Sequence, residues 1–506
     1  MRLLRVCGPP SATVEIMSTL EPPTLTGSRS DHRFFGQPLP LANLFGVEMW
    51  ERFSFYGMQG ILIYYLYYSA SEGGLGISQA AATSIVGAYG GTVYLSTILG
   101  AWIADRLLGS ERTLFYSAVL IMFGHIALAV LPGFAGVGVG LVLVAFGSGG
   151  LKATATSIVG DLYDEQDPRR DAGFSIFYMG INIGALVGPL LTGFLADRHG
   201  FHWGFGLAAV GMFLGLLQYT IYRKHLGDIG KVPPHPLPAE TRTKAAGIGL
   251  VAVVLIAIAA LTGLITTNNM SDIVVVLTIV ATVTYFVIML SSRQITSIER
   301  SRVLSFIPMF IASAVFWSLF QQQFTMVAVY ADTRLNRDLF GWEFPPSWVQ
   351  SINPVFIIIF AGVFAAMWTR LGPRQPSSPI KFAAGTIIMG IAFLCFIPMA
   401  GGGANSAPLL GLVFILLLFT FAELFLSPVG LSLSTKLAPK NFHTQMVALF
   451  YLSVACGTAM AGTLAGFYDE SNEVPYYLWI GGASIAVGIV LALFSPRIKK
   501  LMHGVQ

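Results

Sequence analysis

Charged residues are scarce in this sequence. Only 11% of its 506 residues are Asp, Glu, Lys or Arg, whereas a soluble globular domain has about 25%. The sequence is 55% hydrophobic, with a mean hydropathy of +0.71, and its apolar residues gather in blocks of about 20, the length that spans a bilayer as a helix. The shortage of charge therefore excludes a soluble fold and predicts an all-α membrane protein.

Cysteine is also rare. Cys7, Cys395 and Cys456 have neither a pairing pattern nor the spacing of metal ligands, so we expect no disulfide framework, no metal site and no cofactor. The sequence contains no His-x-x-Glu-His motif, no paired Asp motif and no Ser with a nearby His, which argues against an intramembrane enzyme. Residues 1-40 lack the apolar core of a signal peptide and predict a flexible cytoplasmic tail, in which Met17 is an alternative start.

Fourteen apolar windows predict fourteen membrane-spanning helices. They are 43-68, 79-104, 112-131, 136-160, 173-196, 203-222, 245-266, 272-291, 302-330, 347-369, 380-399, 408-433, 444-467 and 476-495. Basic residues predict the orientation of these spans, because cytoplasmic loops are rich in Lys and Arg. Of the 29 such residues, Arg52 and Lys152 lie within spans and only Arg198, Arg334 and Arg337 fall on one side, which leaves 24 for the other. We therefore expect an inner (plasma) membrane protein with both termini in the cytoplasm.

A repeat divides the chain. Phe177–Phe194 and Phe450–Phe467 align without a gap at a shift of 273 residues, with Phe, Tyr, Gly, Leu, Gly and Phe recurring. Chance similarity between two glycine-rich helices is the alternative. Duplicated halves are common in secondary transporters, which bind substrate where the halves meet. The predicted parts are a 1-40 tail, a 41-222 six-helix half, a 223-300 linker with two extra helices, a 301-496 six-helix half and a 497-506 tail.

Five ionisable residues fall inside the predicted spans. Glu48, Glu51 and Arg52 share the first span, Lys152 lies in the fourth and Glu423 in the twelfth. Intramembrane charges are costly and are functional candidates by default. The shift of 273 maps Lys152 two positions from Glu423, so we predict that these two face each other across a central cavity and can pair. A buried Glu48–Arg52 pair that only fixes helix packing is the structural alternative.

Such a cluster suits proton coupling. A carboxylate beside a cation stays ionised, whereas one that loses its partner in a dry site takes up a proton more readily. A charged substrate can displace one partner and so move a proton, which gains about 2.3 kcal/mol per 100 mV of membrane potential. We assign this role to all five residues.

Several motifs resemble one family. Glu48 and the run Glu51–Gly57 resemble the ExxERFxYY signature of the proton-dependent oligopeptide transporters, a branch of the major facilitator superfamily. The segments Phe174–Pro189 and Phe344–Ala365 resemble further segments of that family, and Gly100–Arg112 resembles the cytoplasmic loop of the superfamily. The resemblance covers residues 40 to about 496. It implies a major facilitator fold of two six-helix halves plus two extra helices.

The same resemblance implies proton-driven import of di- and tripeptides by alternating access. It implies three groups of substrate-contacting residues, namely Arg52, Tyr56 and Lys152 for the peptide carboxylate, Asn182, Asn353 and Glu423 for its amino terminus, and Tyr94, Tyr178 and Trp317 for side-chain pockets. A monomer in the lipid bilayer is expected, with protons and peptides as partners and no nucleic acid. A transporter of the same fold for another small solute, such as nitrate, a peptide-like antibiotic or an amino-acid conjugate, is the alternative.

Departures from the family pattern predict an altered outer gate. Gln59 and Gln321 stand where many bacterial members carry an Arg and a Glu that are thought to close the outer side. Both positions are neutral together, so we hypothesise that a Gln59–Gln321 hydrogen bond replaces that salt bridge. The nearby run of tyrosines at 64, 65, 67 and 68 is interpreted as an aromatic belt at the outer membrane interface.

Overall fold

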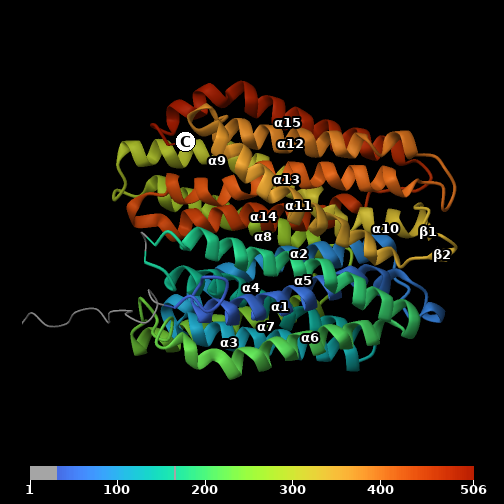
Figure 1. Ribbon diagram of the computed structural model, residues 1–506, viewed down its shortest axis with the longest axis horizontal. Helices are drawn as coiled ribbons and strands as arrows, with labels where there is room; N and C mark the ends of the chain where they lie inside the picture. The colour runs from blue at the N-terminus through green and yellow to red at the C-terminus, as the bar shows by residue number, and fades with distance from the viewer. Residues whose placement is uncertain (1–30, 165–166, 506) are drawn as a thin grey trace, which may run out of the picture.

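The computed structural model describes residues 31–164 and 167–505, and it is an elongated bundle of helices that lie along its long axis (Figure 1). Most of the predicted N-terminal tail, with Cys7 and Met17, lies outside the described residues. The helices are α1 (Leu39–Tyr67), α2 (Gln79–Ile103), α3 (Ser110–Val130), α4 (Gly133–Asp161), α5 (Arg170–His199), α6 (Phe201–Tyr222), α7 (Ala239–Leu261), α8 (Met270–Ser291), α9 (Ser297–Phe320), α10 (Met326–Thr333), α11 (Ile352–Leu371), α12 (Ser378–Leu394), α13 (Leu409–Leu437), α14 (His443–Ala465) and α15 (Glu473–Leu501).

Short elements connect these helices. Two antiparallel strands, β1 (Asp338–Leu339) and β2 (Trp342–Glu343), form a hairpin next to α10. The 3₁₀ segments are η1 (Ala70–Glu72), η3 (Arg223–Leu226), η4 (Gln321–Phe324), η5 (Pro346–Ser351), η6 (Gly372–Arg374), η7 (Ile397–Met399) and η8 (Lys440–Phe442), and η2 (Ala104–Leu108) is a π-helix. Of these, η4 and η5 matter most, because they lie beside the candidate site.

The fourteen predicted spans are confirmed as long helices, α1 to α9 and α11 to α15. Twelve helices in the described part of the chain are long and apolar enough to cross a membrane by length and composition. The other two, α1 and α2, have 29 and 25 residues. Helix α1 carries three buried charges, and α2 is rich in Gly, Ala, Ser and Thr, so neither contains an apolar stretch as long as those of the other twelve.

The predicted span 302-330 is not continuous. Helix α9 ends at Phe320, η4 follows, and α10 begins only at Met326. Thr325 breaks the helix, since its φ of −124° and ψ of −97° lie far from helical values. The three glutamines before the break lower the local hydropathy, but apolar residues resume directly after it, so the stretch was interpreted as one span. The three successive glutamines therefore lie in η4, a short 3₁₀ segment between α9 and α10.

Close helix contacts fix the position of the charges on α1. A Cβ atom at Gly184 of α5 would lie 2.3 Å from the carbonyl oxygen of Met49, and one at Gly188 would lie 2.5 Å from that of Phe53. Only glycine therefore permits α5 to approach this turn of α1. Because Glu48, Glu51 and Arg52 occupy the same turns, the contact holds them inside the bundle rather than toward lipid.

The two halves pack along α2 and α14. A Cβ atom at Gly87 would lie 2.6 Å from the Cα of Gly462, so the two backbones are in direct contact. Of the two extra helices, α8 joins this seam, since Ser271 donates a hydrogen bond to the carbonyl of Ser84 at 2.7 Å. Helix α7, by contrast, has no buried residue. In Figure 1 the N-terminal half, blue to green, lies below the yellow-to-red C-terminal half.

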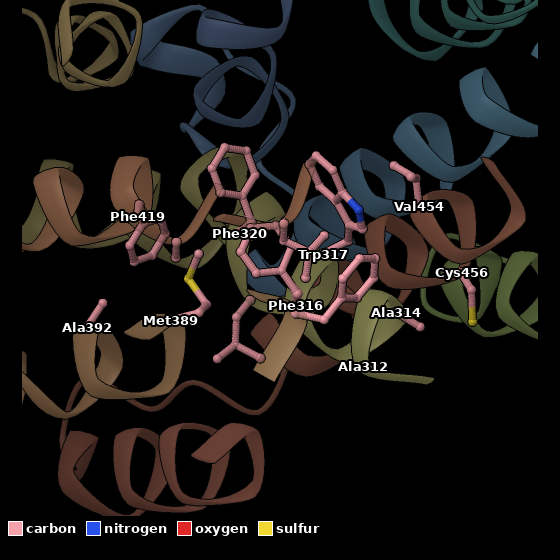
Figure 2. Close-up of a cluster of buried hydrophobic side chains, with 14 of the residues drawn as sticks. Ala312, Ala314, Phe316, Trp317, Phe320, Met389, Ala392, Phe419, Val454 and Cys456 are labelled. Atoms are coloured by element: carbon pink, nitrogen blue, oxygen red, sulfur yellow. The ribbon is translucent and has the colours of Figure 1, made fainter. Parts of the chain in front are cut away.

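The C-terminal half has an aromatic core next to the seam. Phe316 and Phe320 on α9 lie on the side of Phe419 of α13 and Met389 of α12, whereas Trp317 lies toward Val454 of α14 (Figure 2). The rings of Phe316 and Trp317 meet edge to face at 5.3 Å between centroids, and so do those of Trp317 and Phe320. Offset and edge-on contacts of this kind add to the burial of apolar area. The cluster gives α9 a rigid end immediately before its break.

Candidate functional site

A buried ion cluster lies in the middle of α1. The Nε atom of Arg52 lies 3.0 Å from Oε1 of Glu48 and 2.6 Å from Oε2 of Glu51. The spacing of four residues places Glu48 and Arg52 on one helix face. Ser148 of α4 donates a hydrogen bond to Oε1 of Glu51 at 2.5 Å. All three charged side chains are at most 3% exposed, so the cluster is fully removed from solvent.

This cluster is only partly satisfied. Oε2 of Glu48 and Nη2 of Arg52 are buried without hydrogen-bond partners among the described residues. Two carboxylates and one guanidinium leave one negative charge when both acids are ionised. Unpaired buried polar atoms are costly, and a buried charge without compensation is more costly still. The arrangement thus favours an added cation or proton.

Lys152 of α4 provides positive charge near this cluster. It lies within electrostatic range of Glu48, Glu51 and Arg52, and its Nζ atom is 4.4 Å from the centre of the Tyr94 ring on α2, a cation–π contact. The predicted Lys152–Glu423 ion pair is absent from the described residues. The sequence repeat predicts only the approximate depth of Lys152 and Glu423 in their halves, and not the direction of their side chains. The carboxylates of α1 lie within the same half as Lys152.

A cavity of about 80 Å³ lies between the two halves. Among the residues that the sequence predicted to bind substrate, Tyr56, Tyr178 and Asn182 line it from the N-terminal half, and Asn353 and Glu423 line it from the C-terminal half. The structure thus places residues from both halves around one space.

The polar groups of this cavity are only partly engaged. Asn353 donates a hydrogen bond to Oγ1 of Thr420 at 3.0 Å and lies beside the Glu423 carboxyl group. Asn182 donates to the carbonyl of Tyr178 at 2.9 Å. Oε2 of Glu423 is buried and has no hydrogen-bond partner among the described residues. The cavity therefore presents a carboxylate oxygen that a donor on a ligand can reach.

Four predicted substrate residues do not line this cavity. Arg52, Tyr94 and Lys152 lie beyond it in the N-terminal half, although the guanidinium of Arg52 lies beside Tyr56, which does line it. Trp317 packs in the aromatic core of the other half, and its buried Nε1 atom has no hydrogen-bond partner in residues 31–164 and 167–505. Tyr56 thus links the cavity to the ion cluster, and its ring stacks on that of Phe324 at 6.0 Å.

Sequence reasoning missed several lining residues, in particular Gln323, Gln350, Phe320 and Phe324. A signal for Gln350 was present, because it precedes Asn353 by three residues and helical spacing puts both on one face. No comparable signal marks the residues of η4, since their orientation depends on the break after Phe320.

The predicted hydrogen bond at the outer gate is absent. Gln59 and Gln321 are both buried, but no bond joins them among the described residues, and Oε1 of Gln59 has no partner. The hypothesis that the two amides replace a salt bridge is therefore wrong for this conformation. Two neutral amides attract each other much less than opposite charges do, so other contacts are needed to close this end.

Tyrosines close the predicted outer end of the bundle instead. Tyr64 donates to the carbonyl of Ala328 at 3.1 Å, and Tyr67 and Tyr68 both donate to the carboxylate of Asp332, at 2.5 and 2.7 Å. These bonds join α1 to α10, and so join the two halves at the predicted outer end. The interpretation of this run as an aromatic belt at the outer membrane interface is wrong for Tyr64, Tyr67 and Tyr68, because these three bridge the halves.

Replacing both Tyr67 and Tyr68 with phenylalanine is expected to loosen this closure. Each substitution removes a hydrogen bond to a charged group, worth about 1.5–3 kcal/mol, so the closed population should fall at least tenfold relative to the open one. The distance between spin labels at the exposed positions Glu72 and Asp338, measured by electron paramagnetic resonance, should lengthen. The control is Tyr65→Phe, since that ring packs within its own half against Phe205. Unchanged distances in the double variant would rule out the tyrosine closure.

These features define a class of protein. A multi-pass helical bundle of two halves, with a polar cavity at their interface and buried charges beside it, is the architecture of a secondary transporter. A family model described as PTR2, POT family, matches residues 111–480. The chain belongs to this family of peptide transporters.

Relatives cover almost the whole chain. It is 44% identical over 493 residues to a Bacillus subtilis (strain 168) protein named uncharacterized transporter YclF, which covers 97% of this chain and is itself covered completely. It is 39% identical over 497 residues to the di-/tripeptide transporter of Lactococcus lactis subsp. cremoris, with 95% of this chain and 99% of the relative covered.

A solved structure is similarly close. The crystal structure of a point mutant of the peptide transporter POT in complex with alafosfalin matches with a TM-score of 0.88 and 47% identity, over 93% of this chain and 97% of the other. The comparisons confirm the family and the major facilitator type of fold that the motifs on α1, α5 and α11 predicted. They also identify the chain as a transporter rather than an enzyme.

Proposed function

We propose that this protein is a proton-coupled symporter that imports di- and tripeptides across the cell membrane by alternating access. The observation that carries the proposal is the interfacial cavity, in which Glu423 and Asn353 of one half face Tyr56, Tyr178 and Asn182 of the other. A ligand bound by both halves couples its own binding to their relative movement. Relatives named as di-/tripeptide transporters support the choice of substrate.

The chemistry of the site suits a zwitterion. The carboxylate of Glu423, next to Asn353, attracts the ammonium group of a peptide, while Arg52 and Lys152, on the far side of Tyr56, attract its carboxylate. Recognition through the two charged ends leaves side chains unconstrained and so tolerates many peptide sequences. Nitrate, by contrast, has no group that Glu423 would attract.

Proton coupling rests on the incomplete ion cluster. When a peptide carboxylate approaches Arg52 or Lys152, the Coulomb attraction that keeps Glu48 and Glu51 ionised is shared with the ligand. A proton on one of these acids then offsets the excess negative charge. Each proton that follows the membrane potential inward adds about 2.3 kcal/mol per 100 mV, which is sufficient to drive accumulation of a neutral zwitterion.

The resting state of this cycle is closed at its predicted outer end by the three tyrosines. The distribution of Lys and Arg supports a plasma-membrane orientation with both termini in the cytoplasm. The substrate route inside one chain is complete, since the cavity is lined by both halves of the same polypeptide, and a monomer is therefore the functional unit that we propose.

Uptake of a labelled dipeptide into proteoliposomes under an imposed pH gradient tests the proposal. The wild type should accumulate the dipeptide only when the gradient is present, and Lys152→Ala should lose at least about 90% of that uptake, whereas Lys224→Ala, at an exposed site in η3, should retain it. Competition by unlabelled dipeptides but not by nitrate or free amino acids is expected. Strong competition by nitrate alone would instead favour another solute on the same fold.

A further inference from the structure

Gln350 is an unassigned polar residue at the cavity. It lies in η5, is 6% exposed and contributes to the cavity lining. Both Nε2 and Oε1 of its side chain are buried without a hydrogen-bond partner among the described residues. A buried amide usually satisfies both groups, so this side chain is equipped to bind something that enters the cavity.

Its position is fixed by the surrounding backbone. Two neighbours in η5 anchor that segment to α5 of the opposite half, as Trp348 donates to the carbonyl of Leu190 at 3.0 Å and Ser351 to that of Leu186 at 2.8 Å. The Gln350 amide reaches across the interface as well, because a Cβ atom at Gly60 of α1 would lie 3.3 Å from its Oε1. The side chain therefore belongs to one half and lies against the other.

The chemistry of this amide complements that of a peptide bond. A glutamine side chain offers one carbonyl acceptor and an NH₂ donor group without charge, whereas a peptide bond offers an N–H and a C=O. Charged groups of the site account for the two ends of a zwitterion, Glu423 for the ammonium group and Arg52 with Lys152 for the carboxylate. The middle of the ligand is left to neutral residues of the cavity.

We propose that Gln350 recognises the peptide bond of the substrate through a single hydrogen bond, which Oε1 accepts from its N–H or Nε2 donates to its C=O, because these two groups of a trans peptide bond point in opposite directions. The inference rests on the proposed peptide-transport function and names the peptide bond as the part of the substrate that Gln350 binds. It gives the site a means of separating peptides from other zwitterions of equal length, because an unmatched buried amide lowers the affinity for ligands that lack the peptide bond.

The test compares two ligands of the same length. Diglycine contains a peptide bond, while δ-aminovalerate replaces it with two methylene groups and keeps both charged ends. Inhibition of labelled dipeptide uptake is measured for each ligand with the wild type, Gln350→Met and Gln350→Ala. We expect the Gln350 variants to bind diglycine about tenfold more weakly, as loss of one neutral hydrogen bond predicts, and to bind δ-aminovalerate within about twofold of the wild type. The control is Gln37→Met, at a buried glutamine that accepts a hydrogen bond from Tyr163 and does not line the cavity; it should change neither value.

Equal losses for both ligands, or no loss of diglycine affinity, would overturn the inference. If Gln350→Met does not fold, the smaller Gln350→Ala variant supplies the same comparison. If the wild type takes up no dipeptide, the proposed function is contradicted. If the wild type takes up dipeptide normally and the Gln350 variants keep its ligand preference, only the role of Gln350 is contradicted.

Discussion

Replacing Glu423 with glutamine is expected to lower dipeptide uptake driven by a pH gradient about a hundredfold. Within the described part of the chain, Glu423 is the only acidic residue that lines the cavity between the halves, and the substitution keeps its shape while removing its charge. A hydrogen bond between ionised partners contributes about 1.5–3 kcal/mol, which corresponds to roughly tenfold to a hundredfold in affinity, and the loss of a group that exchanges protons adds to this. Uptake by proteoliposomes provides the measurement.

The matched control is Glu240→Gln, which makes the same change at an exposed position on α7. It should transport like the wild type. Counterflow, in which labelled and unlabelled peptide exchange without a gradient, separates binding from coupling. If Glu423→Gln transports at the wild-type rate under a pH gradient, the cavity is not the site of ammonium recognition, and the assignment of both ends of the peptide fails.

Replacing Arg52 with leucine is expected to produce the largest loss of stability. Its guanidinium is 2% exposed and is within ion-pair distance of both Glu48 and Glu51. Removing one partner of a buried ion pair costs about 3–5 kcal/mol, since it leaves an uncompensated charge. Thermal unfolding of the purified protein in detergent, followed by tryptophan fluorescence, should show a substantially lower midpoint, and uptake should be lost.

Two further variants separate charge from geometry. Arg52→Lys keeps the positive charge but lacks the planar group that reaches two carboxylates at once, so we expect an intermediate midpoint. Combining Arg52→Leu with Glu48→Gln and Glu51→Gln removes the stranded charges and should recover much of the stability without recovering uptake. A midpoint for Arg52→Leu equal to that of the wild type would show that the cluster is hydrated and not a buried network.

Local chemistry in the sequence predicted the cluster on α1 well. Three charges within five residues of an apolar span leave few options besides pairing inside the bundle, and Glu48 and Arg52 have the spacing of one helix face. The choice of partner for Lys152 failed. A repeat that relates positions 273 apart specifies roughly where a residue lies in its half, but the direction of its side chain depends on neighbours such as Tyr94, which only tertiary packing brings close.

The outer closure was harder to predict for a related reason. Gln59 and Gln321 attracted attention as departures from a family pattern, and that pattern carries no information on what replaces a lost salt bridge. The replacement uses Asp332, which lies in α10, beyond the helix break. Because apolar residues resume after the three glutamines, residues 302-330 were interpreted as one continuous span. Asp332 then fell outside that span, and nothing connected it with the tyrosines of α1.

The exposure of α7 has a practical consequence. None of its residues contributes to the packed interior, so a label on an exposed polar residue of its first turns, such as Glu240 or Lys244, leaves the moving halves undisturbed. The N-terminal end of this helix therefore offers a place to attach a fluorophore for single-molecule recording of the transport cycle.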